Sequence, residues 1–205
     1  MTAPIHPRAL ALIRRFEGYH RKLPNGNARA YADSVGILTI GYGTTYYEGG
    51  RKVKFGDEIT HDRAVSLLEN QLDWNYLPAV DNAIRVPVHS LMRGACGSLA
   101  YNIGTAGFRR STLARMINER RWGECRRAFR MWRYAGGRVL AGLERRRGDE
   151  ADLFMEGVRA LQSVPMPSRK PSEQPSWIDQ IAAWIRGWFG EPKPVLNLFR
   201  DARRK

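Results

Sequence analysis

Residues 28–46 of the chain, ARAYADSVGILTIGYGTTY, predict a β-hairpin. In its second half, bulky residues alternate with small ones: Leu38, Ile40 and Tyr42 against Thr39, Gly41 and Gly43. A strand places alternate residues on opposite faces, so we expect one bulky face packed on a core. The other face carries a hydroxyl and two glycines, and glycine inside a strand often marks a close approach to the backbone. We therefore predict an open face on which a ligand can lie.

The turn of this hairpin supplies a carboxylate. Asp33-Ser34-Val35-Gly36 has the aspartate and glycine that a type I turn favours at its first and fourth positions. A reversal centred near Gly36 places Asp33 opposite Thr39, with both side chains on the open face. An ordinary turn aspartate explains the same residues, so the acid upstream decides between the two interpretations.

That acid is Glu17, at the end of a helix predicted over residues 7–17. Pro7 suits a first turn and Gly18 a C-cap. Leu10, Ile13 and Glu17 share one helical face. Glu17 is then either a solvated residue at a fraying end or a partly desolvated acid with a raised pKa, as general acid catalysis requires.

Composition limits the class of protein. The 205 residues allow one or two domains, and 43% are apolar, which indicates a globular chain. We expect no membrane span, no signal peptide and a cytoplasmic location before release. The net charge of +14 indicates a polyanionic partner: nucleic acid, a bacterial wall or an anionic membrane.

The metal-binding residue types show no ligand spacing. We expect Cys96 and Cys125 to be buried free thiols, and the four histidines to be surface residues: His6, His20, His61 and His89. The sequence therefore predicts neither a metal nor a cofactor.

The remainder of the chain is organised in three parts. Residues 52–55 predict a short third strand, and residues 60–163 are almost wholly helical, with Thr60, Ser90 and Ser111 as expected caps. The helix from Ser90 is rich in small residues and places Asn102 inward. Residues 163–176 hold four prolines and four serines and predict a linker.

The tail, residues 177–205, predicts an amphipathic helix with a basic end. Its apolar stripe consists of Trp177, Ile181, Trp184, Ile185 and Trp188. Two interpretations are open. Its tryptophans contact an anionic membrane or lipopolysaccharide, or the helix docks on the preceding domain.

Several sequence blocks resemble phage lysozymes of glycoside hydrolase family 24. They are Glu17-Gly18, Tyr31-x-Asp33, Gly36-x-x-Thr39-Ile40-Gly41-Tyr42-Gly43-Thr44, Ala100–Gly104, Phe108–Leu113, and Trp132 with the blocks from Ala135 to Phe154. The resemblance covers roughly residues 5–160, with the blocks in the family's order. One departure is the segment from Tyr19 to Ala30, which is longer by about seven residues, an insertion that costs little loop-closure entropy.

The resemblance implies an α+β, lysozyme-like fold over residues 1–162, with a small N-terminal hairpin lobe, a larger helical lobe and a cleft between. It implies hydrolysis of the β-1,4 bond between N-acetylmuramic acid and N-acetylglucosamine in peptidoglycan. Glu17 would be the general acid, while Asp33 and Thr39 would position water and stabilise charge. Gly41, Tyr42, Asn102 and Arg146 would contact substrate. Arg146 aligns best with an arginine that pairs with the acid, and Arg145 and Arg147 are alternatives.

We therefore expect a monomeric phage endolysin that acts on peptidoglycan, needs a holin for export, and binds no nucleic acid. Two alternatives stay open. A lytic transglycosylase would cleave the same bond without water, and a non-catalytic basic protein would disrupt the wall or membrane through its tail.

Overall fold

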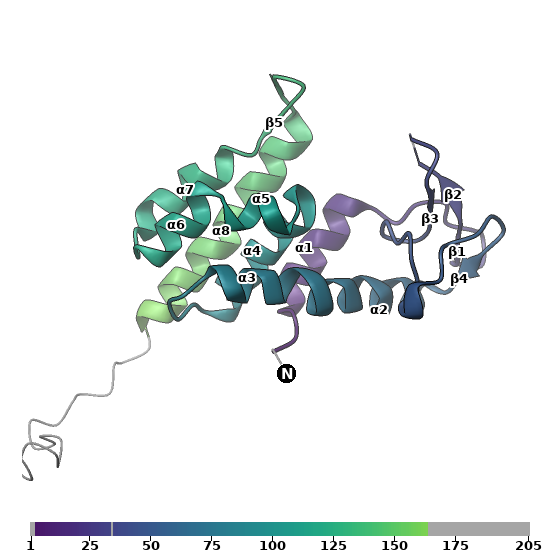
Figure 1. The fold of residues 1–205 in the computed structure, drawn as a ribbon, viewed down its shortest axis with the longest axis horizontal. Helices are drawn as coiled ribbons and strands as arrows, with labels where there is room; N and C mark the ends of the chain where they lie inside the picture. The colour runs from purple at the N-terminus through teal and green to yellow at the C-terminus, as the bar shows by residue number, and fades with distance from the viewer. Residues whose placement is uncertain (1–2, 34, 164–205) are drawn as a thin grey trace, which may run out of the picture. The chain divides into compact units, whose positions relative to one another are not determined.

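The computed structural model describes residues 3–33 and 35–163 of the chain. Short strands occupy the region after the first helix, and helices make up most of the remainder (Figure 1). The first part contains α1 (Pro7–Glu17), β1 (Ala28–Arg29), β2 (Tyr31–Ala32), β3 (Leu38–Thr39), a 3₁₀ turn (Glu48–Gly50) and β4 (Glu58–Ile59). β1 pairs with β4 and β2 with β3, both antiparallel.

The helical part begins with α2 (His61–Gln71), which continues through a π-helical turn (Leu72–Tyr76) into α3 (Leu77–Ala83). It then contains α4 (Ser90–Ile103), α5 (Thr105–Arg109), α6 (Thr112–Asn118), α7 (Trp122–Arg130), the β5–β6 hairpin (Tyr134–Ala135 and Arg138–Val139) and α8 (Ala141–Ser163). This arrangement confirms the predicted α+β class.

The predicted linker and tail fall outside the described residues, apart from Ser163, which is the last residue of α8. Both interpretations of the tail therefore stay predictions. Within the described ranges, no helix combines the length and the apolar character that a membrane span requires.

α1 has the bounds that the sequence predicts. Pro7 is in its first turn, and the His6 ring accepts a hydrogen bond from the Arg8 N–H at 3.2 Å. Gly18 ends the helix with φ +72°, and its N–H donates to the Arg14 carbonyl at 3.0 Å. Leu10 and Ile13 are buried, so the face that carries Glu17 packs inward.

α4 lies at the centre of the main core, as its small residues predict. A Cβ added at Gly94 would lie 2.4 Å from the Ala9 Cβ of α1, and one at Gly157 of α8 would lie 2.6 Å from the Met92 Cγ. The predicted cap of α4 is wrong by one residue. The His89 ring accepts from the Leu91 N–H at 3.3 Å, and Ser90 is the first helical residue.

α2 joins two cores. Its Ala64 and Leu68 are buried in the main core with α1 and α4, whereas Leu67 belongs to a second cluster under the strands. That second cluster consists of Ala28, Ala30, Ile40, Tyr47, Val53 and Leu67. The side chains of one helix therefore fix the strand region against the helical part.

The predicted second strand ends earlier than expected. β3 stops at Thr39, and Ile40 forms an isolated bridge with Thr44 that closes a tight turn over residues 41–43. Gly41 and Gly43 adopt φ of +62° and +95°, values that an L side chain rarely adopts. The glycines therefore form a turn, and the prediction that they floor an open strand face is wrong.

The predicted third strand, residues 52–55, is also wrong. Only Lys52 forms a bridge there, with Tyr46, and the strand that pairs with β1 is Glu58–Ile59.

Gly41 gives a first testable prediction. We expect Gly41→Ala to lower the free energy of unfolding by about 2–4 kcal/mol, since it combines left-handed strain with overpacking. The added Cβ would lie 2.8 Å from the Ala64 Cβ of α2. Gly36→Ala is the matched control, because Gly36 has φ +83° but open space around it. Urea denaturation measures both, and equal losses would contradict the packing argument.

Candidate active site

Glu17 lies at the C-terminal end of α1, against an arginine of α8. Its Oε1 accepts a hydrogen bond from Arg146 Nη1 at 2.7 Å. The Glu17 side chain is 23% exposed and that of Arg146 5%. Of the three candidate arginines, Arg146 makes this contact, Arg145 is exposed, and Arg147 turns to other partners. Glu17 is thus a carboxyl group with one buried cationic partner and partial access to solvent.

A buried carboxylate, Glu150, holds Arg146 in place. Glu150 Oε1 accepts from Arg146 Nε at 3.1 Å, from Arg147 Nη2 at 2.8 Å and from the Ser98 hydroxyl at 2.6 Å. Burial raises the pKa of Glu150, and the two guanidinium groups oppose that shift. Burial likewise lowers the pKa of Arg147, against the effect of Glu150. Glu150 is not predicted as a site residue from the sequence, because an acid four residues after Arg146 also fits a solvated helix face.

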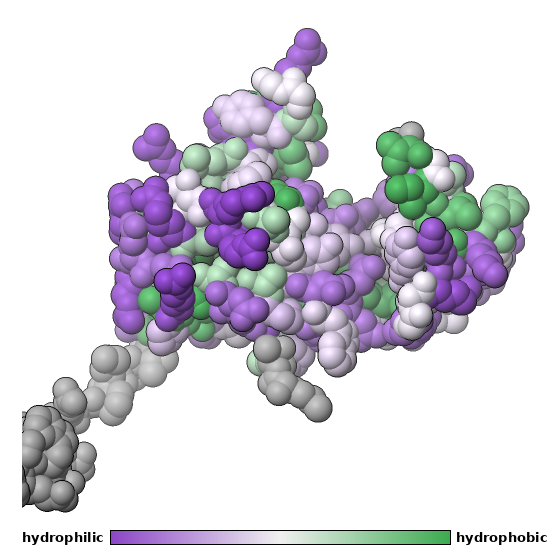
Figure 2. Space-filling view, viewed as in Figure 1, coloured by the Kyte–Doolittle hydropathy of each residue, from purple (hydrophilic) through white to green (hydrophobic). Residues whose placement is uncertain are grey.

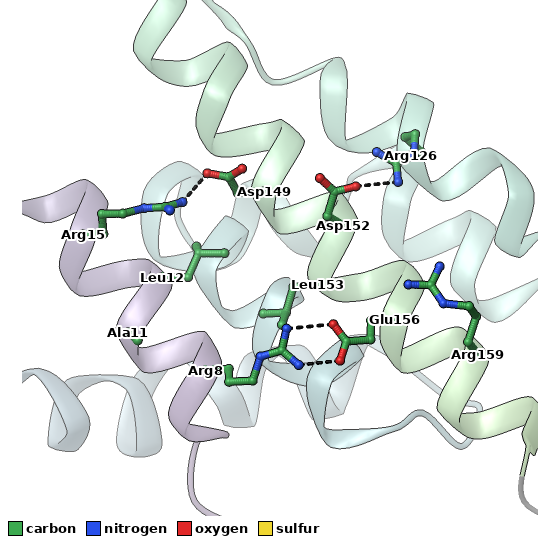
Figure 3. Close-up of a pocket in the computed structure, with 10 residues that line it drawn as sticks. All are labelled: Arg8, Ala11, Leu12, Arg15, Arg126, Asp149, Asp152, Leu153, Glu156 and Arg159. Atoms are coloured by element: carbon green, nitrogen blue, oxygen red, sulfur yellow. Dashed lines mark hydrogen bonds and ion pairs between the residues drawn. The ribbon is translucent and has the colours of Figure 1, made fainter.

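Ion pairs clamp α1 against α8 on another face of the pair. Arg15 pairs with Asp149, and Arg8 forms a two-pronged pair with Glu156 (Figure 3). These residues line an open groove of about 600 Å³, whose acids all have arginine partners. We assign the groove a structural role, because the pairs fix the position of α1 along α8 and therefore of Glu17 against Arg146.

Two tyrosines border the acid. Burial raises the pKa of Tyr76 and Tyr101, and the charge of Glu17 adds to both shifts. Their ring centroids lie 4.9 Å apart. The Tyr101 hydroxyl donates to the Tyr42 carbonyl at 3.2 Å, so α4 connects the surroundings of Glu17 with the glycine turn after β3.

The hairpin places Asp33 and Thr39 on one face, although not directly opposite each other as predicted. Thr39 pairs with Tyr31, and the Asp33 N–H donates to the Ile37 carbonyl at 2.9 Å. Cross-strand partners share a face, so Asp33 and Thr39 are diagonal neighbours. The residue opposite Asp33 is Ile37 instead of the predicted Thr39, so the turn is shorter than predicted. Asp33 Oδ1 stabilises this shorter turn, because it accepts hydrogen bonds from the N–H groups of Val35 and Ile37 at 3.0 and 2.8 Å.

Thr39 is buried, with 5% of its surface exposed. Its Oγ1 donates to the Ile37 carbonyl at 3.1 Å. The hydroxyl proton is thereby engaged, and the remaining lone pair can accept a hydrogen bond.

The segment after α1 ties Glu17 to this hairpin. The His20 ring forms a hydrogen bond with the Glu17 carbonyl at 2.8 Å, and the His20 N–H donates to the Gly41 carbonyl at 3.4 Å. The same ring lies 5.7 Å from the Tyr31 ring, centroid to centroid. His20 therefore contacts both the backbone of the acid and the cross-strand partner of Thr39.

The molecular surface agrees with this placement. It is hollowed between the helical part and the β2–β3 hairpin (Figure 2), and the C-terminal end of α1 lies at this hollow (Figure 1).

Three residues that the resemblance assigns to substrate binding, Gly41, Tyr42 and Asn102, contact other residues of the chain. Gly41 packs on Ala64, and the Tyr42 hydroxyl lies 3.1 Å from both Arg14 Nε and His61 Nε2. Both residues are buried. Asn102 is exposed, and its Oδ1 accepts from Arg147 Nη1 at 3.0 Å.

Each of the four histidines, which were predicted to be surface residues, makes a ring hydrogen bond within the chain. His6 and His89 cap helices, His20 contacts the backbone at Glu17, and His61 contacts Tyr42. Single ring contacts of this kind have no sequence spacing that would have indicated them. The two cysteines are buried free thiols, as predicted; burial raises the pKa of Cys125 to about 12.

Comparisons with known proteins agree with this arrangement. Residues 15–150 match the family described as "Phage lysozyme". The endolysin of Salmonella phage P22 is 34% identical over 151 residues, which cover 74% of this chain and 97% of that protein. The SAR-endolysin of Enterobacteria phage P21 is 35% identical over 130 residues, covering 62% of this chain and 74% of the relative.

Solved structures show the same fold. The endolysin from Escherichia coli O157:H7 phage FAHEc1 aligns with a TM-score of 0.66 at 32% identity, covering 76% of this chain and 96% of the other. The muramidase domain of SpmX from Asticaccaulis excentricus aligns with a TM-score of 0.63 at 30% identity, covering 75% and 99%. With a family match across most of the described residues and a curated relative covered almost end to end, the chain belongs to the phage lysozyme family and is a peptidoglycan-degrading glycoside hydrolase.

Proposed function

We propose that this chain hydrolyses the β-1,4 bond between N-acetylmuramic acid and N-acetylglucosamine in bacterial peptidoglycan, as a phage endolysin. The observation that carries the proposal is the Glu17–Arg146 pair at the C-terminal end of α1, together with Asp33 and Thr39 on one face of the β2–β3 hairpin. Glycoside hydrolysis needs an acid beside the leaving oxygen and a second group on the other side of the sugar. The four residues supply both.

In this proposal Glu17 protonates the leaving oxygen. The reaction leaves Glu17 as a carboxylate, which Arg146 stabilises from 2.7 Å. Arg146 cannot itself donate the proton, because a guanidinium stays protonated in proteins. Its role is to orient the Glu17 carboxyl and to neutralise the charge that proton transfer creates.

Asp33 stabilises positive charge that develops on the sugar ring. Two backbone N–H groups fix its Oδ1, so the carboxylate is oriented before substrate binds. Thr39 holds the attacking water as a hydrogen-bond acceptor, because its own proton is given to the Ile37 carbonyl. The resemblance to the family favours direct attack by water, with inversion at the anomeric carbon.

Mass analysis of the muropeptides released from purified wall tests the proposal. Hydrolysis leaves reducing N-acetylmuramic acid ends that carry one added water. A lytic transglycosylase would leave 1,6-anhydro ends that lack that water, and a non-catalytic wall-disrupting protein would leave the glycan strands uncut. Reducing ends support the proposed function, and either other result overturns it.

The net charge of +14 supports an anionic substrate and leads to a second prediction. Peptidoglycan carries carboxylates, and electrostatic attraction is screened over about 8 Å at physiological ionic strength. We therefore expect wall lysis to be fastest at low ionic strength and to slow by about tenfold or more toward 0.5 M salt. Turbidity of a wall suspension measures this, and lysis rates indifferent to salt would contradict a role for the charge.

A further inference from the structure

A second pocket lies beside the hairpin that carries Asp33. Its volume is about 550 Å³, and its lining includes Arg21, Lys22, Arg29, Tyr31 and Phe55. Tyr31 belongs to β2, two residues before Asp33, and it pairs with Thr39. The pocket and the proposed active site therefore share one strand.

Two of its cations have no internal counterion. Arg29 pairs with Glu58, with Nε donating to Oε1 at 3.0 Å. Arg21 and Lys22 have no carboxylate within 4 Å among the described residues, and both are exposed. By contrast, Arg51 in the same strand region pairs with Asp57. The uncompensated charge of the pocket therefore suits an anion from outside the chain.

The pocket also exposes aromatic surface. Phe55 is 87% exposed, and the Arg21 guanidinium lies 6.0 Å from the centroid of the Tyr31 ring. Hydrophobic side chains gather at this end of the molecule, over the β2–β3 hairpin and the adjoining loops (Figure 2). An apolar wall beside two cations fits a ligand that has both carboxylate and aliphatic groups.

Hydrogen bonds hold the backbone around Arg21 in a defined conformation. Arg21 has φ +53°, which is uncommon for a residue with a side chain. It is held there because the Arg29 N–H donates to the Arg21 carbonyl at 3.2 Å and Lys22 bridges Ala28. The Tyr19 hydroxyl donates to the Gly26 carbonyl at 3.1 Å. Strain that the surrounding structure maintains is often found at binding sites.

The segment between Tyr19 and Ala30 turns back on itself through the Lys22–Ala28 bridge, next to the β1–β4 pair, and carries Arg21 and Lys22 to the pocket. We propose that this pocket is a subsite for the acidic peptide stems of the glycan strand that the enzyme cleaves, with Arg21 and Lys22 binding stem carboxylates and Phe55 covering the aliphatic part.

The inference rests on the proposed function and names a further part of its substrate. The sugar rings are neutral, and the lactyl carboxyl of muramic acid is consumed in the amide bond to the stem. The free carboxylates of the polymer are therefore on the stem peptides. A strand that crosses the β2–β3 hairpin brings those stems past the pocket.

The test compares a double variant, which carries both Arg21→Gln and Lys22→Gln, with the wild-type chain. The substrates are native wall and wall whose free stem carboxylates have been coupled to an amine as amides. Glutamine keeps much of the side-chain length and the same backbone strain. The matched control is Arg109→Gln with Arg110→Gln, an adjacent exposed pair on and after α5 that removes the same charge.

On native wall we expect the double variant to need about three- to tenfold more substrate for half-maximal rate, with an unchanged maximal rate. On amidated wall wild type and variant should coincide, while the control pair should follow wild type on both substrates.

Other outcomes separate the two proposals. Equal half-saturation of variant and wild type on native wall overturns the subsite, as does a loss that persists unchanged on amidated wall or that the control pair reproduces. A wild-type chain that releases no reducing ends from either wall overturns the proposed function itself.

Discussion

Glu17→Gln is expected to slow wall hydrolysis by about 10²–10⁴-fold, the range that a positioned general acid contributes. The amide has nearly the shape of the carboxyl but cannot donate a proton to the leaving oxygen. Arg146 keeps its second carboxylate partner, Glu150, so the variant should fold. Release of reducing ends from purified wall measures the effect, with thermal unfolding followed in parallel.

The control for this variant is Glu119→Gln, the same chemical change on the exposed surface beside Arg115 and Arg121. It should retain the wild-type rate. If the Glu17→Gln protein is folded and clears wall at the wild-type rate, Glu17 is not the general acid. The cationic surface would then be the better explanation of wall disruption.

Glu150→Ala is expected to lower the free energy of unfolding by about 3–5 kcal/mol, because it removes one partner of a buried ionic network. Glu150 has no exposed surface, and it accepts hydrogen bonds from both Arg146 and Arg147. Without it, two buried guanidinium groups lose their shared carboxylate, and desolvation of each charge is left uncompensated. Urea denaturation measures the loss.

Glu156→Ala is the matched control, six residues further along α8. Its carboxylate pairs with Arg8 at the surface, where an ion pair contributes about 1 kcal/mol or less. Similar losses in the two variants would show that the Glu150 network behaves as an ordinary surface pair. A folded Glu150→Ala protein should also hydrolyse wall more slowly, since Arg146 would no longer be held against Glu17.

Local sequence signals were sufficient for α1 and for the direction of its acid. Pro7 and Gly18 mark the ends of the helix, and the spacing of Leu10, Ile13 and Glu17 places all three on one face. Both properties depend on residues within a few turns, which is the range over which helix periodicity and capping act. The small-residue packing of α4 follows from a similar local pattern, whereas the α+β class was implied by the resemblance to the family.

The glycine turn shows where such signals stop. The alternation of bulky and small residues from Leu38 to Gly43 fits a continuous strand and a strand followed by a tight turn equally well. The decision is made by Ala64, more than twenty residues later, whose Cβ leaves no room for a side chain at Gly41. The strand that pairs with β1 was missed for a similar reason, because two-residue strands carry almost no pattern.

The sequence by itself predicted the residue types of the candidate site: an acid at a helix end, a turn aspartate and a threonine. The resemblance to the family added three consecutive arginines as candidate partners of the acid. Only the tertiary structure decided which arginine meets the acid. Consecutive helical residues point about 100° apart, so the choice of Arg146 depends on how α8 is rotated against α1 and α4. That rotation is set by Gly94, Gly157 and the buried Glu150, contacts between segments that no local spacing encodes.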